Sequence, residues 1–91
     1  MPFMLAAQNG DVATVERLLK AGAKVDGDAI SGNQTNTLLT PLYTAAAAGQ
    51  AAVITVLLKA GAKINRTAAR GFTPLFIAAH EGHTAAVSVL V

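Results

Sequence analysis

The sequence predicts an all-α fold in which short helix–turn–helix units stack into a solenoid. One phrase occurs three times along the 91 residues, at 73–79 (TPLFIAA), at 40–46 (TPLYTAA) and, in a frayed form, at 1–7 (MPFMLAA). Each copy is followed by a glycine and then by an apolar stretch with helical spacing. Recurrence of one phrase at a fixed register is typical of repeat proteins, in which each unit stacks on its neighbours.

The glycines set the length of the repeat. Gly10, Gly49 and Gly82 each follow the phrase after two variable residues. The distance from Gly49 to Gly82 is 33 residues, whereas that from Gly10 to Gly49 is 39, so the first connection carries six extra residues. Each glycine is expected between the two helices of a unit, where a positive φ reverses the chain.

Capping signals predict where the helices begin and end. Thr40 and Thr73 precede Pro41 and Pro74, an order typical of an N-cap followed by the first helical residue. Met1 cannot cap, so fraying of the first helix is expected. Glycines at 22 and 61 follow the second helices as C′ residues. The predicted helices lie at about 2–9, 13–21, 41–48, 52–60, 74–81 and 85–91.

Extended fingers are predicted between the units. The finger at 63–72 is short, and the one at 24–39 is longer and polar. The longer segment suits an extended hairpin, and it could equally form a mobile loop.

Composition excludes several kinds of protein. The absence of cysteine excludes disulfides and thiolate metal sites. No apolar run approaches the 18 residues of a membrane span, and no signal peptide is visible, so an intracellular setting is the default expectation. The net charge is only +2 and the basic residues are dispersed, which argues against nucleic acid as a partner.

The motifs resemble the ankyrin repeat. The segments TPLFIAAHEGH (73–83) and VLLKAGAKIN (56–65) are similar to its period of 33 and its Thr-Pro-Leu-His-x-Ala core. The resemblance implies a single domain over 1–91 with β-hairpin-like fingers projecting from one side. Its repeats are expected at about 1–33 (with an extended finger at 26–39), 34–66 and 67–91, the last one truncated. Met4, Tyr43 and Phe76 replace the histidine of that core.

The resemblance also implies a non-catalytic scaffold that binds a protein partner through its finger tips and the concave face of its first helices. Arg70 and Phe72 are the expected anchors, because arginine and aromatic residues dominate binding hot spots. Alternatively, Phe72 packs on Tyr43 or Phe76. The predicted partner-binding residues are Gln8, Asn9, Asp26, Asp28, Asn33, Leu39, Arg66, Arg70, Phe72, His80 and Glu81.

Catalysis and metal binding have little support in the sequence. His80-Glu81-Gly82-His83 lacks the His-Glu-x-x-His spacing that places two imidazoles on one helix face. No nucleophilic triad or paired carboxylates occur. His83 is instead expected to stabilise a turn. The prediction is therefore no enzyme, no metal site and no cofactor.

A second hypothesis is self-association. Apolar residues at both ends are expected to face water, as in a fragment of a longer repeat protein, and to stack or exchange into a homo-oligomer. The residues predicted for this contact are Phe3, Met4, Val87, Leu90 and Val91.

Overall fold

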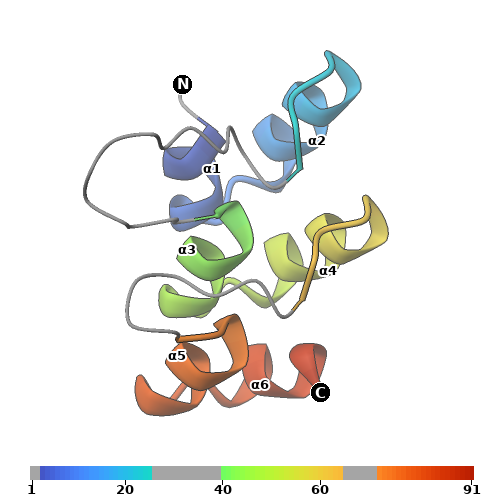
Figure 1. The fold of residues 1–91 in the computed structure, drawn as a ribbon. Helices are drawn as coiled ribbons and strands as arrows, with labels where there is room; N and C mark the ends of the chain where they lie inside the picture. Colours follow the sequence, from blue (N-terminus) through green and yellow to red (C-terminus); the bar gives the residue numbers. More distant parts are fainter. Residues whose placement is uncertain (1–2, 26–39, 65–71) are drawn as a thin grey trace, which may run out of the picture.

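Six short helices form the described part of the chain, residues 3–25, 40–64 and 72–91 of a computed structural model (Figure 1). Most of the two segments predicted as fingers, 24–39 and 63–72, lies outside these residues, namely 26–39 and 65–71. The helices are α1 (Phe3–Asn9), α2 (Val12–Lys20), α3 (Pro41–Ala47), α4 (Ala51–Lys59), α5 (Pro74–His80) and α6 (Thr84–Leu90). No strand occurs in the described ranges, so the all-α prediction is confirmed.

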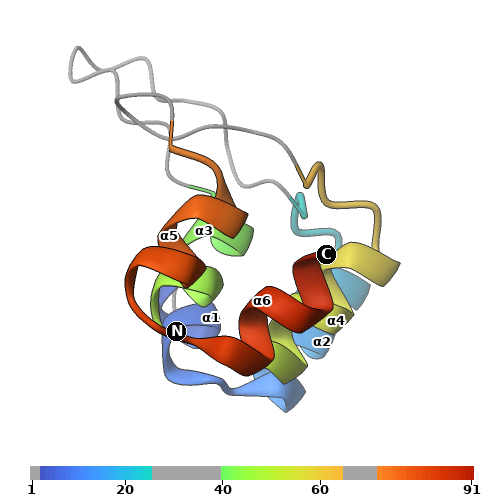
Figure 2. The same cartoon turned by 90° about the horizontal axis from the view of Figure 1, so that it is seen from below.

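The helices are arranged in two layers. The first helix of each unit contacts its neighbour, α1 with α3 and α3 with α5, and the second helices α2, α4 and α6 form a parallel row (Figure 1). Within a unit, α1 packs on α2, α3 on α4 and α5 on α6. The view along the stack shows the three pairs almost superposed (Figure 2). The predicted stack of helix pairs is therefore confirmed.

Local capping explains where the helices begin. The Thr40 hydroxyl accepts a hydrogen bond from the Tyr43 N–H, and the Thr73 hydroxyl accepts one from the Phe76 N–H, both at 3.1 Å. Each threonine thus satisfies one of the amides that a helix start leaves unpaired. Every predicted boundary lies within one residue of the observed one, apart from the first, which falls on a residue outside the described ranges.

Glycine turns end both kinds of helix. Gly10, Gly49 and Gly82 have φ of 75°, 74° and 78°, which confirms the predicted reversal between the helices of a unit. After α2, the Ala23 N–H donates to the Leu18 carbonyl at 3.0 Å. The same pattern recurs after α4, so α2 and α4 each end in a Schellman motif.

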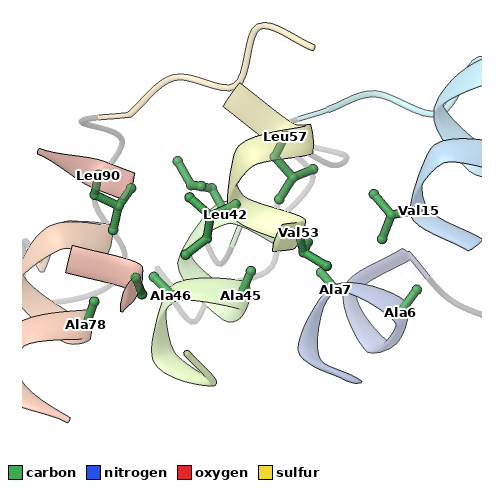
Figure 3. Packing of buried hydrophobic residues seen from close by; sticks show 12 residues of the cluster. Ala6, Ala7, Val15, Leu42, Ala45, Ala46, Val53, Leu57, Ala78 and Leu90 are labelled. Carbon is green, nitrogen blue, oxygen red and sulfur yellow. The ribbon is translucent and has the colours of Figure 1, made fainter. Parts of the chain in front are cut away.

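The core lies between the two layers and is built mainly from small residues. Leu42, Ile54 and Leu57 are the largest fully buried side chains. Leu42 and Leu57 lie near the middle of the stack (Figure 3). The first helices contribute alanines, of which Ala45 and Ala46 are fully buried. Alanine lets neighbouring helices approach closely, which explains how a chain with few aromatic residues packs a continuous core.

The two ends of the stack differ, which corrects the expectation that all five predicted end residues face water. Leu90 is only 4% exposed because α6 directs it into the core between the layers (Figure 3). Phe3, Met4 and Val87 are half-buried, and Phe3 and Val87 pack against the core cluster. Val91 alone is strongly exposed, at 88%.

Equivalent positions of the three units show which side chains a neighbouring repeat would cover. Leu42 and Ala46 are fully buried under α5, whereas their counterparts on α5, Leu75 and Ala79, are exposed. At the other end, Thr14 stands where the later units have Val53 and Ala86. The two ends thus differ at this position of the second helix, while each end also exposes a leucine of its first helix, Leu5 or Leu75.

Candidate functional site

The face formed by the first helices contains a shallow hollow of about 290 Å³. The side chains at the end of α3 are small: Ala47 is its last residue and Ala48 follows it. At the same two positions the first unit has Gln8 and Asn9, and the third has His80 and Glu81. The hollow is lined by Gln8, Tyr43, Thr44, Ala47 and Ala48. The two alanines thus leave the middle of this face open.

A row of aromatic rings runs along the next helix. The ring centroids of Phe72 and Phe76 lie 4.6 Å apart with an interplanar angle of 34°, and those of Phe76 and His80 lie 5.9 Å apart at 28°. These separations are in the range of favourable offset ring contacts. The alternative that Phe72 packs on Phe76 is thus realised, and Phe76 itself remains 45% exposed.

The aromatic row and the hollow belong to one surface. Phe76 and His80 occupy the same repeat positions on α5 as Tyr43 and Ala47 on α3. Because α3 and α5 pack side by side, equal positions face the same way about 8–10 Å apart. The hollow of α1 and α3 and the exposed ring of Phe76 on α5 therefore lie on the same face, and Phe76 itself does not line the hollow.

A polar group ends the row. His80 Nδ1 lies 3.5 Å from Glu81 Oε2, and both side chains are largely exposed. An ion pair in such an exposed setting adds little stability. The two residues are therefore available to a partner.

Hydrogen bonds between units hold this face in register. The Gln50 side-chain amide donates to the Gln8 carbonyl, and the His83 Nε2–H donates to the Ala47 carbonyl, each at 3.0 Å. Gln8 and Ala47 hold the same position in their units, so one clamp occurs twice. Each clamp fixes the last turn of a first helix, where the hollow is formed.

The residue at the clamp position of the first unit caps its own helix instead. Asp11 Oδ1 accepts a hydrogen bond from the Thr14 N–H at 3.1 Å, and its Oδ2 accepts one from the Thr14 hydroxyl at 2.7 Å. These two bonds lower the pKa of the Asp11 carboxyl, because they stabilise its charged form. The N–H and the hydroxyl of Thr14 therefore both have a hydrogen-bond acceptor within their own unit.

The predicted partner-binding residues divide into two groups. Gln8 and Asn9 lie at the end of α1, and Phe72, His80 and Glu81 lie on or beside α5. Gln8 lines the hollow, and Phe72 and His80 belong to the aromatic row. The remaining predicted residues lie outside the described ones: Asp26, Asp28, Asn33, Leu39, Arg66 and Arg70.

Sequence reasoning missed Tyr43, Thr44 and Phe76 as members of the face. Tyr43 and Phe76 occupy the fourth position of the repeated phrase, and Thr44 occupies the fifth. The fourth position was interpreted only as the place of the histidine of the repeat core, not as part of a binding face. It also missed the cap formed by Asp11, which the preference for aspartate before a helix could have revealed. The clamp of Gln50 had no local signal, since its acceptor is 42 residues away.

The described residues were also compared with the requirements of a metal site and of a membrane span. They contain no group of three or more His, Asp or Glu side chains placed to hold a metal ion. His83 contacts the Ala47 carbonyl, consistent with a role in stabilising the turn. Within the same ranges, the helices are all too short to cross a membrane.

Comparison with known proteins identifies the fold. A family model described as "Ankyrin repeats (3 copies)" matches residues 3–91. The comparison with curated proteins gave no match. Among solved structures, the human ASB11 ankyrin repeat domain is similar, with 31% identity and a TM-score of 0.84 over 99% of this chain. The chain spans 38% of the length of that domain. With the family model covering nearly every residue, this chain belongs to the ankyrin repeat family.

Proposed function

We propose that the chain is a non-catalytic protein-interaction scaffold that binds its partner on the face of the first helices. The observation that carries this proposal is the hollow on the face of α1 and α3, with the 45% exposed ring of Phe76 at the matching repeat position of the neighbouring α5. Aromatic side chains bury large areas with few rotamers to freeze, which makes them effective anchors. The finger tips, including Arg70, extend the same proposal to residues outside the described ones.

The shape of the hollow suggests what the partner contributes. Its lining combines the small apolar side chains of Ala47 and Ala48 with the polar side chains of Gln8 and Thr44. One apolar or aromatic side chain of a partner segment fits such a hollow, and the backbone of that segment can bond to the polar side chains. The clamps at Gln50 and His83 keep the face rigid, so little ordering entropy is lost on binding.

Paired variants test this proposal in an affinity pull-down with identification of the bound proteins. Phe76→Ala and Ala47→Arg, which fills the hollow, are expected to abolish capture of the specific partners. Ala52→Arg makes the same change at an exposed position of α4 and serves as the matched control. Circular dichroism verifies that all three variants are folded. Unchanged capture by both Phe76→Ala and Ala47→Arg would contradict the proposal.

Self-association is a second candidate, and the exposed α5–α6 end favours it. The surface is centred on Leu75, Ala79 and Val87, whose counterparts in the second unit are fully buried. Sedimentation velocity at several concentrations is the measurement. Leu75→Lys is expected to abolish an oligomer formed through this end, and Leu5→Lys, at the exposed Leu5 of the opposite end, is expected to leave it unchanged. A monomer at every concentration would contradict the idea.

A further inference from the structure

The second helices carry a surface that the proposed function does not use. All five Lys and Arg residues in the described ranges lie on α2, on α4 or in the turns that follow them. None lies on α1, α3, α5 or α6. The residues are Arg17, Lys20, Lys24, Lys59 and Lys63. Positive charge is thus concentrated on the layer opposite the candidate site.

A second hollow, of about 320 Å³, opens between α2 and α4 within this basic layer. Each helix lines it with three residues at positions i, i+3 and i+4, which form one face of a helix. The floor consists of apolar side chains, and two lysines and one glutamate surround it. The lining residues are Glu16, Leu19, Lys20, Val56, Lys59 and Ala60.

The repeat places the two lysines as neighbours. Lys20 and Lys59 hold the same position in successive units, each in the last turn of its helix. Because α2 and α4 pack side by side, these positions lie about 8–10 Å apart, close to the screening length of physiological salt. Two ammonium groups at this distance repel each other weakly, and an anion placed between them would relieve that repulsion.

Neither lysine is neutralised from within the described part of the chain. No described carboxylate lies within ion-pair distance of the Lys20 or Lys59 ammonium group. Both lysines lie in the last turn of their helices, where a positive charge interacts favourably with the negative end of the helix dipole. This interaction is a structural role. The Schellman motifs already satisfy several of the carbonyls at these ends, so the ammonium groups keep their bonding capacity.

We propose that the hollow between α2 and α4 binds an acidic peptide segment in which carboxylates flank a bulky apolar side chain. The carboxylates pair with Lys20 and Lys59, and the apolar side chain covers Leu19 and Val56. Both parts are needed, because an exposed ion pair alone contributes little and the apolar floor alone has no preference for an acidic ligand. The surface is separate from the first-helix face, so the two can be occupied together.

Titration with a synthetic peptide tests this assignment, followed by amide chemical shifts in the ¹⁵N-labelled protein. The probe carries one phenylalanine between two aspartates, and its controls replace the aspartates by asparagines or the phenylalanine by alanine. Shifts are expected to concentrate at Leu19, Lys20, Val56, Lys59 and Ala60. Shifts spread evenly over the surface, or equal binding of either control peptide, would overturn the proposal.

Charge variants of the protein predict whether peptide binding becomes weaker or stronger. Lys20→Gln and Lys59→Gln are each expected to weaken binding about two- to fivefold, the usual effect of losing an exposed ion pair. Glu16→Gln removes the one carboxylate of the lining and is expected to strengthen binding. Arg17→Gln changes the net charge as the lysine variants do, but lies outside the hollow and is expected to have almost no effect.

Two outcomes would show that charge alone acts here. An equal loss of binding in Arg17→Gln and Lys20→Gln would refute a defined site. Vesicles of phosphatidylserine that bind as tightly as the peptide, with the same dependence on Lys20 and Lys59, would identify a lipid surface as the ligand and refute the peptide. Retention of peptide binding in Phe76→Ala distinguishes this site from the proposed function.

Discussion

The clamp between His83 and the preceding unit can be measured with two glycine-to-alanine substitutions. Gly49 and Gly82 hold the same position in successive units and have φ of 74° and 78°. A Cβ on Gly49 would lie 2.6 Å from His83 Nδ1, whereas a Cβ on Gly82 would meet nothing within 4 Å. Both substitutions impose the same backbone strain, and only Gly49→Ala also displaces the clamp.

The expected costs follow from these two contributions. An L-residue in the left-handed region costs about 1–2 kcal/mol, which applies to both variants. Displacing the imidazole also removes its hydrogen bond to the Ala47 carbonyl, worth about 0.5–1.5 kcal/mol. Gly82→Ala should therefore lower the free energy of unfolding by about 1–2 kcal/mol, and Gly49→Ala by about 1.5–3.5 kcal/mol.

Urea denaturation followed by circular dichroism measures both costs, and His83→Ala completes a double-mutant cycle. In that background, Gly49→Ala should cost no more than Gly82→Ala, because there is no ring left to displace. His83→Gln should keep most of the stability, since Gln50 forms the same bond in the preceding unit. Equal costs of the two glycine substitutions in the wild-type background would refute the reasoning.

Three further predictions concern the core, a cap and a charge. Leu42→Ala should cost about 2–5 kcal/mol and Leu75→Ala at the same repeat position much less, because only Leu42 is fully buried; urea denaturation at low protein concentration compares them. Thr40→Ala should cost about 1 kcal/mol through loss of the N-cap, and Thr40→Ser should recover most of it by the same measurement. The folded-state pKa of Asp11 is lowered, so its charge stabilises the fold above the unfolded pKa and loses this effect as pH falls through the folded one. Asp11→Asn should therefore destabilise the protein at neutral pH and much less at a pH below both values, which thermal unfolding across pH would show; a constant difference would contradict it.

Local signals in the sequence were sufficient for the helices. Thr40 and Thr73 lie directly before prolines, and the glycines at 49 and 82 mark the reversals, so both ends of each helix are encoded within a few residues. Stacking of the units followed from the repetition itself, because identical faces pack identically. The architecture could therefore be predicted without knowledge of any contact.

Contacts between units could not be predicted from local sequence patterns. The burial of Leu90 depends on how α6 packs on α4, and a terminal valine-rich segment gives no indication of which residue turns inward. The lining of the candidate site could not be predicted for the same reason. The hollow depends on Tyr43 and Thr44 of one unit meeting Gln8 of another, and only the stacked structure brings these residues together.

One repeat position shows how identical backbones acquire different functions. Asp11, Gln50 and His83 each follow the glycine between two helices; Gln50 and His83 bond to a carbonyl of the preceding unit, and Asp11 bonds within its own, the first unit described. A short aspartate instead caps its own helix, and its side chain cannot donate a hydrogen bond to a carbonyl while it is ionised. A donor with a longer side chain is therefore required wherever a preceding carbonyl is to be held. It follows that Gln50→Asp would cap α4 and release the last turn of α1, loosening the hollow beside Gln8 without unfolding the helix.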